Sequence, residues 1–213
     1  MKRFDFRALF GAGLILLGGL MLLEKLNIIQ GASSVFWGLA FLAGAAYFAM
    51  VLLQDPQNRW WAIFPAAALG GMGGASLLPE AFSGWGGGIF LGTLGLGFFI
   101  VYIINRIHWW AIIPGGVLLT LAGVSTLTEF EAFSAVNTGS IFFIGLGFTF
   151  LLVALLPNPQ GETRWAYIPA IALVLMGGLL GTQATAGLVG YVWPAALILA
   201  GLLVIVGFFR SRD

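Results

Sequence analysis

Long apolar runs dominate the chain, and short segments with polar or charged residues separate them. A helix that crosses a bilayer needs about 20 mostly apolar residues, because it rises about 1.5 Å per residue through about 30 Å of hydrocarbon. Eight runs are of this kind, and they are continuous rather than alternating, which favours helices over a β-barrel. They are Ala8–Leu23, Val35–Leu53, Trp60–Leu78, Gly86–Ile104, Trp109–Leu127, Ile141–Leu156, Trp165–Gln183 and Tyr191–Phe209. The pattern predicts an all-α polytopic membrane protein in which residues 1–213 form a single transmembrane domain.

Composition excludes several classes of protein. Hydrophobic residues make up 60% of the chain and charged residues 8%, against about 45–50% and about 25% in soluble domains. So few charged residues cannot form the polar surface of a soluble enzyme. The net charge of +1 provides no positive surface for binding nucleic acid. The sequence contains no cysteine, which excludes a thiolate nucleophile and cysteine-bound metal. We therefore expect no catalytic residue, cofactor or metal ligand. The expected partners are the lipid bilayer and, laterally, another membrane protein or a second copy.

The basic residues predict the orientation. Eight of the nine lie in the N-terminal tail, the even-numbered loops or the C-terminal tail, and Lys25 is the exception. Because short loops rich in Lys and Arg stay in the cytoplasm, both termini are predicted to be cytoplasmic. Trp61, Trp110 and Trp165 are then interface anchors, since an indole ring has one apolar and one hydrated edge.

A five-residue segment recurs at the start of three odd-numbered spans. It is WAIFP from Trp61, WAIIP from Trp110 and WAYIP from Trp165. Glycines recur with a similar period, 49 to 56 residues, and let helices approach closely in lipid, where van der Waals packing drives association. The predicted helix-packing glycines are Gly19, Gly74, Gly123 and Gly178 in the odd spans and Gly44, Gly95, Gly145 and Gly201 in the even spans.

Each period contains two spans, so the repeating unit is a helical hairpin and every copy enters the membrane in the same direction. We expect four parallel hairpin repeats, at about residues 1–57, 58–106, 107–162 and 163–213. The four copies can close into a ring with approximate fourfold pseudo-symmetry or stack in an open arc. The sequence leaves both arrangements open.

Polar side chains inside the spans are few and uncharged. The absence of ionisable groups at depth argues against proton relays, ion-coupled transport and intramembrane proteolysis. The hydroxyl groups there are expected to bond a carbonyl one turn back in the same helix; they include Thr93, Thr120, Ser125 and Thr149. His108, the only histidine, has no carboxylate or serine partner in the sequence and is interpreted as an interface residue.

One polar feature follows the repeat. The side chains of Glu24, Glu80, Glu129 and Gln183 each come five or six residues after the landmark glycine of an odd span, at its outer end. In a closed ring they would form a polar collar that favours cations at the outer mouth. We favour the simpler interpretation that helix ends near water carry polar residues, with lysine excluded there by topology.

The first and last hairpins carry a family resemblance. From Arg7 the chain has RALFGAGLILLGGLMLLEKLNI, then FWGLAFLAGAAYF to Phe48, and the last hairpin has YVWP followed by LILAGLL. These segments resemble the two-helix unit of the bacterial LiaI/LiaF-like transmembrane region and, less closely, the HdeD-type membrane proteins. The first resemblance implies a cytoplasmic-membrane protein linked to envelope stress, acting by contact with a sensor kinase. Those proteins add a soluble C-terminal domain, whereas this sequence ends at Asp213, so no family residue is transferred.

Two functional hypotheses follow from these patterns. The first is a non-enzymatic multi-pass membrane protein with an interaction, sensing or membrane-organising role, whose contacts are made through glycine-lined helix faces. The alternative is a passive channel or facilitator along the pseudo-symmetry axis, with the polar collar at its mouth. An enzyme is a distant third, because no general base, nucleophile or metal cluster is visible.

Overall fold

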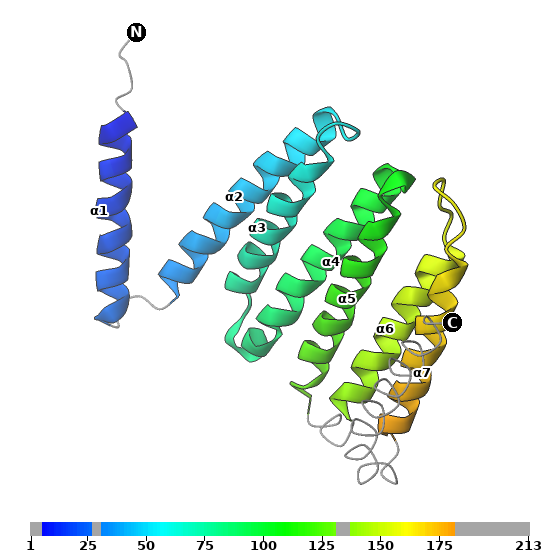
Figure 1. Ribbon diagram of the computed structural model, residues 1–213. Coiled ribbons are helices and arrows are strands. Elements are labelled where there is room, and N and C mark those ends of the chain that lie inside the picture. The colour runs from blue at the N-terminus through cyan, green and yellow to red at the C-terminus, as the bar shows by residue number, and fades with distance from the viewer. Residues whose placement is uncertain (1–5, 27–30, 131–136, 182–213) are drawn as a thin grey trace, which may run out of the picture. The chain divides into compact units, whose positions relative to one another are not determined.

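The computed structural model describes residues 6–26, 31–130 and 137–181, and this part of the chain is helical (Figure 1). The α-helices are α1 (Phe6–Lys25), α2 (Ala32–Gln54), α3 (Ile63–Ser76), α4 (Gly86–Ile104), α5 (Ile112–Leu127), α6 (Thr138–Leu155) and α7 (Tyr167–Gly181). Short 3-10 helices lie between them: η1 (Trp60–Ala62), η2 (Glu80–Trp85), η3 (Arg106–Ala111) and η5 (Arg164–Ala166). The all-α prediction is confirmed for the described residues.

Five helical segments are long and apolar enough to cross a membrane. They are Ala32–Gln54, Glu80–Ile104, Arg106–Leu127, Thr138–Leu155 and Arg164–Gly181, with mean hydropathies from 1.5 to 2.1. Even the shortest, at 18 residues, is about 27 Å long. These segments are typical of a helical membrane protein. Two further predicted spans correspond to α1 and to η1 with α3, whereas the last predicted span, Tyr191–Phe209, lies outside the described residues.

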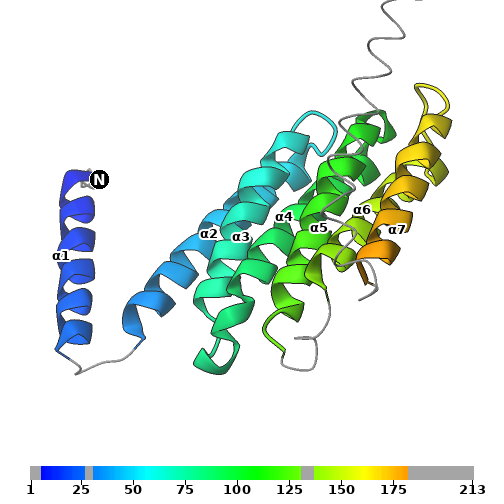
Figure 2. The ribbon, with the colours of Figure 1, turned by 60° about the horizontal axis from the view of Figure 1, so that its bottom comes forward.

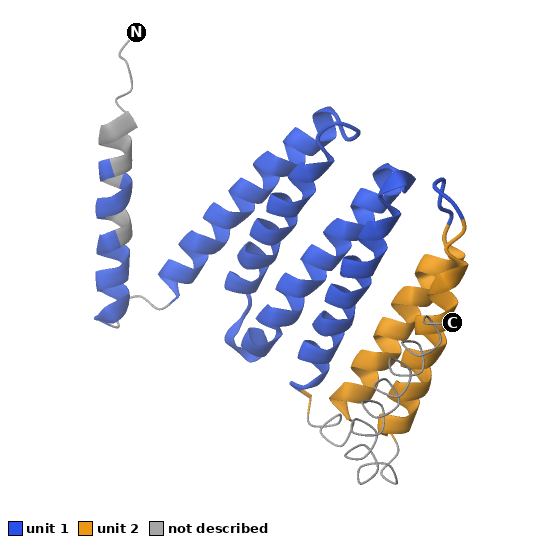
Figure 3. Ribbon diagram, in the orientation of Figure 1, with its two compact units in different colours: residues 1–129, 157–161 blue, residues 130–156, 162–213 orange. Residues whose placement is uncertain are grey.

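The chain divides into two compact units (Figure 3). Unit 1 comprises residues 1–129 and 157–161, and unit 2 comprises residues 130–156 and 162–213. In unit 1 the helices α2, α3, α4 and α5 run up and down in an open row, each packed mainly against its neighbour in sequence (Figures 1 and 2). In unit 2, α6 packs against α7.

The three odd-numbered helices that follow an arginine-bearing loop begin in the same way. A 3-10 turn containing Trp-Ala leads into the α-helix, whose third residue is proline in each case: Pro65, Pro114 and Pro169. Proline is tolerated there because the first turn of a helix has no partner for the missing N–H. The alanine after each tryptophan is 0% exposed; these residues are Ala62, Ala111 and Ala166.

The predicted anchors Trp61, Trp110 and Trp165 also share their packing. Each indole ring meets a phenylalanine of the preceding helix edge to face, with ring centroids 6.1–6.3 Å apart and planes at 73–79°. This is a favourable aromatic geometry. The partners are Phe48 in α2, Phe98 in α4 and Phe150 in α6. The three indoles stay about half exposed, at 41–49%, so each fixes a helix start while keeping one edge open to its surroundings.

A small apolar core lies at the end of unit 1 that carries Arg59 and Arg106, which we call the basic end. Val101 of α4 and Ala111 before α5 are completely buried there, and Leu52 of α2 and Ile63 of α3 are 8% exposed. Aromatic residues such as Phe64 pack around this cluster. The core therefore joins all four helices of the row at one end.

Candidate functional site

The closest helix contacts are made where at least one of the two partners is glycine. A β-carbon placed on Gly73 of α3 would lie 2.9 Å from the carbonyl oxygen of Gly38 in α2. In unit 2, a β-carbon on Gly177 of α7 would lie 2.8 Å from the carbonyl oxygen of Ser140 in α6. Both distances are shorter than real side-chain contacts, so the backbones meet directly at these two positions.

The pair α4 and α5 has the same type of contact, but here the glycines belong to the even-numbered helix and the carbonyl oxygens to the odd-numbered one. A β-carbon on Gly88 would lie 3.1 Å from the carbonyl oxygen of Ala122, and one on Gly95 would lie 3.0 Å from that of Gly115. Ala122 occupies the place that glycine takes in α3 and α7, eight residues after the helix-starting proline. Close approach thus recurs in the three helix pairs that are joined by an arginine-bearing loop.

The predicted landmark glycines have mixed environments. Gly95 is at a close approach, a β-carbon on Gly44 would lie 3.0 Å from the side chain of Leu69, and one on Gly74 would lie 3.5 Å from that of Ile89. Three others, Gly19, Gly123 and Gly178, have no described atom of another element within 4 Å of that point. The carbonyl oxygen of Gly145 accepts a hydrogen bond from the Thr149 hydroxyl at 2.9 Å. Gly201 lies outside the described residues.

The hydroxyl groups inside the helices behave as expected in three of the predicted cases. Thr93 donates to the carbonyl oxygen three residues earlier at 2.9 Å, and Thr120 and Thr149 donate to those four residues earlier at 2.8 and 2.9 Å, which confirms the prediction for these residues. Ser140 instead crosses to the next helix, where its hydroxyl donates to the carbonyl oxygen of Gly177 at 2.5 Å in a buried site. Sequence reasoning missed this bond, although a serine facing a glycine helix is the usual signal for one.

The residues of the predicted collar have separate surroundings. The Glu24 carboxylate of α1 accepts the N–H of Gly31, the residue before α2, at 3.2 Å. Glu80 is the exposed first residue of η2, and the Glu129 carboxylate packs on Gly84 of the same short helix. The structure therefore brings Glu80 and Glu129 to one element and places Glu24 at another. Gln183 lies outside the described residues.

Loops at the basic end are tied together by side chains that the sequence did not single out. Tyr102 is 5% exposed; its hydroxyl donates to the carbonyl oxygen of Pro157 at 3.0 Å and accepts from the Arg106 guanidinium at 3.3 Å. The indole N–H of Trp109 donates to the Gln160 side chain at 3.0 Å. These bonds hold residues 157–161 against the start of α5. They join positions about 50 residues apart, which a local motif does not reveal.

His108 lies beside these residues in sequence, at a kink of η3 where its backbone leaves helical geometry (φ −82°, ψ 39°). Its ring centroid is 4.7 Å from that of Trp60 and 6.2 Å from that of Trp110. The Nδ1 atom is buried without a hydrogen-bond partner. In the described part of the chain, no three His, Cys, Asp or Glu side chains lie close enough together to hold a metal ion.

The loop between α2 and α3 is held by its own polar residues. The Asp55 carboxylate accepts from the backbone N–H of Asn58 at 3.3 Å and from its side-chain amide at 2.8 Å. These bonds hold the pKa of Asp55 below its ordinary value, with the side-chain bond having the larger effect and the backbone bond the smaller. The nearby Arg59 also lowers this pKa. The Gln57 amide donates to the carbonyl oxygen of Ile104 at 3.0 Å, which fastens this loop to the end of α4.

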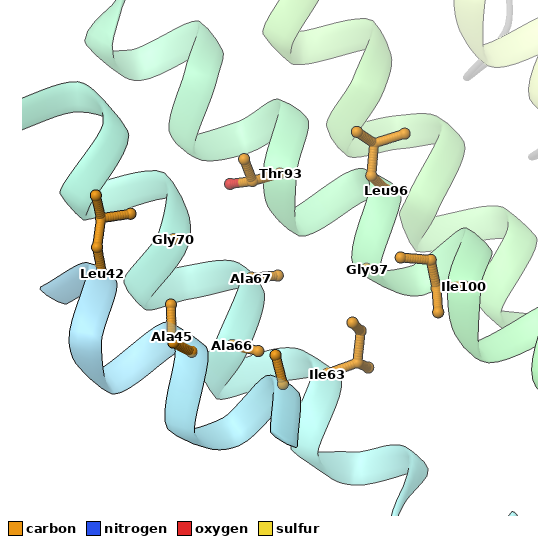
Figure 4. A pocket seen from close by; sticks show the side chains of 12 residues that line it. Leu42, Ala45, Ile63, Ala66, Ala67, Gly70, Thr93, Leu96, Gly97 and Ile100 are labelled. Carbon is orange, nitrogen blue, oxygen red and sulfur yellow. The ribbon is translucent and has the colours of Figure 1, made fainter. Parts of the chain in front are cut away.

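One face of unit 1 carries an open apolar groove of about 470 Å³, bounded by α2, α3 and α4 (Figure 4). We call it the alanine groove, because Ala45 and Ala49 of α2 and Ala66 and Ala67 of α3 line it. The side chain of Thr93 from α4 contributes a polar atom. Unit 2 has a smaller groove of about 200 Å³ between α6 and α7.

Comparison of the chain with protein-family models, curated proteins and solved structures finds no match among any of the three. The residues described above therefore carry the functional argument.

Proposed function

We propose that this chain is a non-enzymatic, multi-pass membrane protein that organises its membrane surroundings through lateral contacts. The supporting observation is that small side chains lie inside and large apolar ones outside, the reverse of a soluble protein. Glycine and alanine occupy the closest helix contacts, whereas large apolar residues face outward; Leu53 is 75% exposed, Ile103 73% and Ile168 76%. Such surfaces are unfavourable in water by about 25 cal/mol per Å², whereas in lipid they cost nothing and small-residue contacts hold helices together.

We further propose eight spans arranged as four parallel hairpins, with both termini in the cytoplasm. The five segments of membrane-spanning length and the arginines at one end of α2 to α5 support this topology. The resemblance to the LiaI/LiaF-like transmembrane region adds envelope stress as the expected context.

Single-cysteine labelling tests the topology, and the natural sequence provides a cysteine-free background. Ser83 in η2 and Pro159 in the loop after α6 are exposed residues separated by α4, α5 and α6. With a membrane-impermeant maleimide on intact cells, we expect Ser83→Cys to react and Pro159→Cys to react only after permeabilisation. Reaction of both variants in intact cells would contradict the proposed spans.

An ion-flux measurement separates this function from the channel alternative. We expect purified protein in liposomes to pass no cations, and Glu80→Gln to change nothing, because Glu80 is an exposed residue at a helix start. Glu129→Gln is the matched control on the other carboxylate next to η2. Cation flux that falls when either carboxylate is neutralised would replace the organising role with a channel.

A further inference from the structure

The alanine groove is suited to an apolar ligand without hydrogen-bonding groups. Alanine and glycine of α2 and α3 form most of two walls together with Leu42 and Ile63, and the third wall consists of Thr93, Leu96, Gly97 and Ile100 of α4 (Figure 4). The Thr93 hydroxyl donates its proton to the carbonyl oxygen of Phe90 at 2.9 Å, within its own helix. A hydrocarbon chain therefore meets no unsatisfied donor in this groove.

The alanine groove is short enough to lie within one membrane leaflet. On α3 the lining runs from Ile63 to Gly70, which is about 10 Å at a rise of about 1.5 Å per residue. Ile63 follows directly on the tryptophans of η1 at the basic end, so the groove opens at the predicted interface. One leaflet contributes about 15 Å of hydrocarbon. Deeper in the membrane the groove ends, because α2 and α3 meet at Gly38 and Gly73.

This depth distinguishes between two occupants. A transmembrane helix of a partner needs a contact surface that continues through about 30 Å of hydrocarbon. A single acyl chain from the leaflet at the basic end needs only the part of the surface that is open here. We therefore propose that the alanine groove binds one acyl chain of a glycerophospholipid from the cytoplasmic leaflet. This inference rests on the proposed membrane location.

The other helix pairs show what controls the size of the groove. On α3 one lining residue lies two positions before Pro65, and three lie one, two and five positions after it. Four lining residues of α7 have the same spacing relative to Pro169; they are Tyr167, Ala170, Ile171 and Val174. The same place therefore opens in both units. Its volume is about 470 Å³ in unit 1 and about 200 Å³ in unit 2.

The groove of unit 1 has α4 as a third wall, and a residue of the even-numbered helix also differs between the pairs. The close-approach positions of the even-numbered helices are Gly38, Ser140 and Gly88. Eleven residues after them lie Ala49 in α2, Leu151 in α6 and Phe99 in α4. In the α4 and α5 pair, ring atoms of Phe99 lie 3.0 Å from a β-carbon placed on Gly115, so the aromatic ring occupies the place of the ligand. Alanine at this position leaves the groove of unit 1 widest.

Arg59 lies in the loop that leads into the open end of the groove. Arg59 is exposed, comes four residues before Ile63 and donates from Nη1 to the side chain of Gln54 at 2.8 Å. Its guanidinium has five N–H donors in all, which suits a phosphate group. The Asp55 carboxylate in the same loop accepts hydrogen bonds from Asn58 and also interacts with the charge of Arg59, but no ion pair joins Asp55 and Arg59, both of which the structure describes. The loop thus offers a positive group to the phosphate of a lipid whose chain lies in the groove.

Photolabelling of the full chain tests the proposal. The protein is reconstituted in vesicles of phosphatidylethanolamine and phosphatidylglycerol that contain a small fraction of phosphatidylglycerol with a diazirine in the middle of one acyl chain. After irradiation, adducts are mapped by mass spectrometry. We expect the segment from Ala66 to Gly70 to be labelled about fivefold more than outward residues such as Leu39 of α2, a ratio that corresponds to about 1 kcal/mol.

Two double variants of α2 provide the matched comparison. Ala46→Leu with Ala49→Leu narrows the groove, as Leu151 does in unit 2, and is expected to reduce labelling of the segment about fivefold. Ala40→Leu with Ala43→Leu has the same spacing on exposed positions outside the groove and is expected to change nothing. Equal labelling in the two double variants would overturn the proposal.

Wild-type labelling keeps the test decisive if the groove variant does not fold. Labelling of outward residues with no preference for the groove would leave the membrane location intact and overturn the lipid site. Labelling of the groove by a diazirine fatty acid but not by the phospholipid would overturn it too. If no residue of any helix were labelled, the proposed membrane location itself would fail, which is a distinguishable result.

Discussion

Adjacent glycines in α7 allow the close-packing argument to be tested with minimal changes. Gly177 and Gly178 are neighbours in the same helix, but a β-carbon on Gly177 would lie 2.8 Å from backbone atoms of Ser140 and Ile144 in α6, whereas one on Gly178 has no described atom within 4 Å. We predict that Gly177→Ala destabilises the protein and that Gly178→Ala stabilises it. Both variants add one methyl group, so only the packing differs.

The magnitude follows from the geometry. Ordinary contact with a β-carbon begins at 3.4 Å, so Gly177→Ala must move the two backbones apart by about 0.6 Å, and overpacking of this kind costs about 1–3 kcal/mol. Replacing glycine by alanine in a helix gains about 1 kcal/mol in either variant. That gain cancels in the comparison. The two variants should therefore differ in unfolding free energy by about 1–3 kcal/mol.

Unfolding by sodium dodecyl sulfate in mixed micelles, followed by tryptophan fluorescence, measures the difference. Thermal unfolding of the purified protein in one detergent gives an independent ranking. We expect the order Gly178→Ala, wild type, Gly177→Ala from most to least stable in both assays. Equal stabilities for the two variants, or a more stable Gly177→Ala, would refute the direct backbone contact between α6 and α7.

Three further changes test other parts of the structure. Ser140→Ala removes the buried hydrogen bond to α7 and should lower the unfolding free energy by about 0.6–2 kcal/mol in the same assay. An unchanged unfolding free energy would show that the hydroxyl does not make this bond. Tyr102→Phe frees the carbonyl oxygen of Pro157, at about 1 kcal/mol, and should raise the trypsin cleavage rate between α6 and α7 about fivefold. Because the pKa of Asp55 is lowered, its carboxylate should protect the Asn58 amide from hydrogen exchange at neutral pH and lose this effect only below pH 3.8. Asp55→Asn should remove the pH dependence, and loss of protection near pH 6 would contradict the assignment.

The sequence predicted the membrane-type helices well where polar residues flank an apolar run. The predicted span Gly86–Ile104 coincides with α4, and the helix stops where Asn105 accepts the N–H of the second residue of η3. The span predicted to end at Leu78 is shorter in the structure, because α3 ends at Ser76. Pro79 restricts the residue before it to extended geometry, so local chain chemistry overrides hydropathy there.

Contacts between distant segments could not be predicted in this way. The bond from Tyr102 to Pro157 joins residues 55 positions apart, and the packing of Glu129 on Gly84 joins two loops. Hydropathy and spacing locate such residues along the chain, but a contact depends on how each helix is rotated about its axis. That rotation is set by packing, which no single helix specifies on its own.

The landmark glycines show the limit of periodicity as evidence. Any residue of a repeated helix recurs with the same period, so spacing alone does not identify the face that packs. One residue turns the helix by 100°, since there are 3.6 residues per turn, and this rotation separates buried Gly73 from Gly74 and buried Gly177 from Gly178. Small size does not resolve the choice either, because the position eight residues after each proline is Gly73, Ala122 or Gly177 and the next position is glycine in all three helices. Glycine or alanine in a membrane helix allows a close approach, but the side on which the neighbouring backbone lies is set by the rotation of the packed helix.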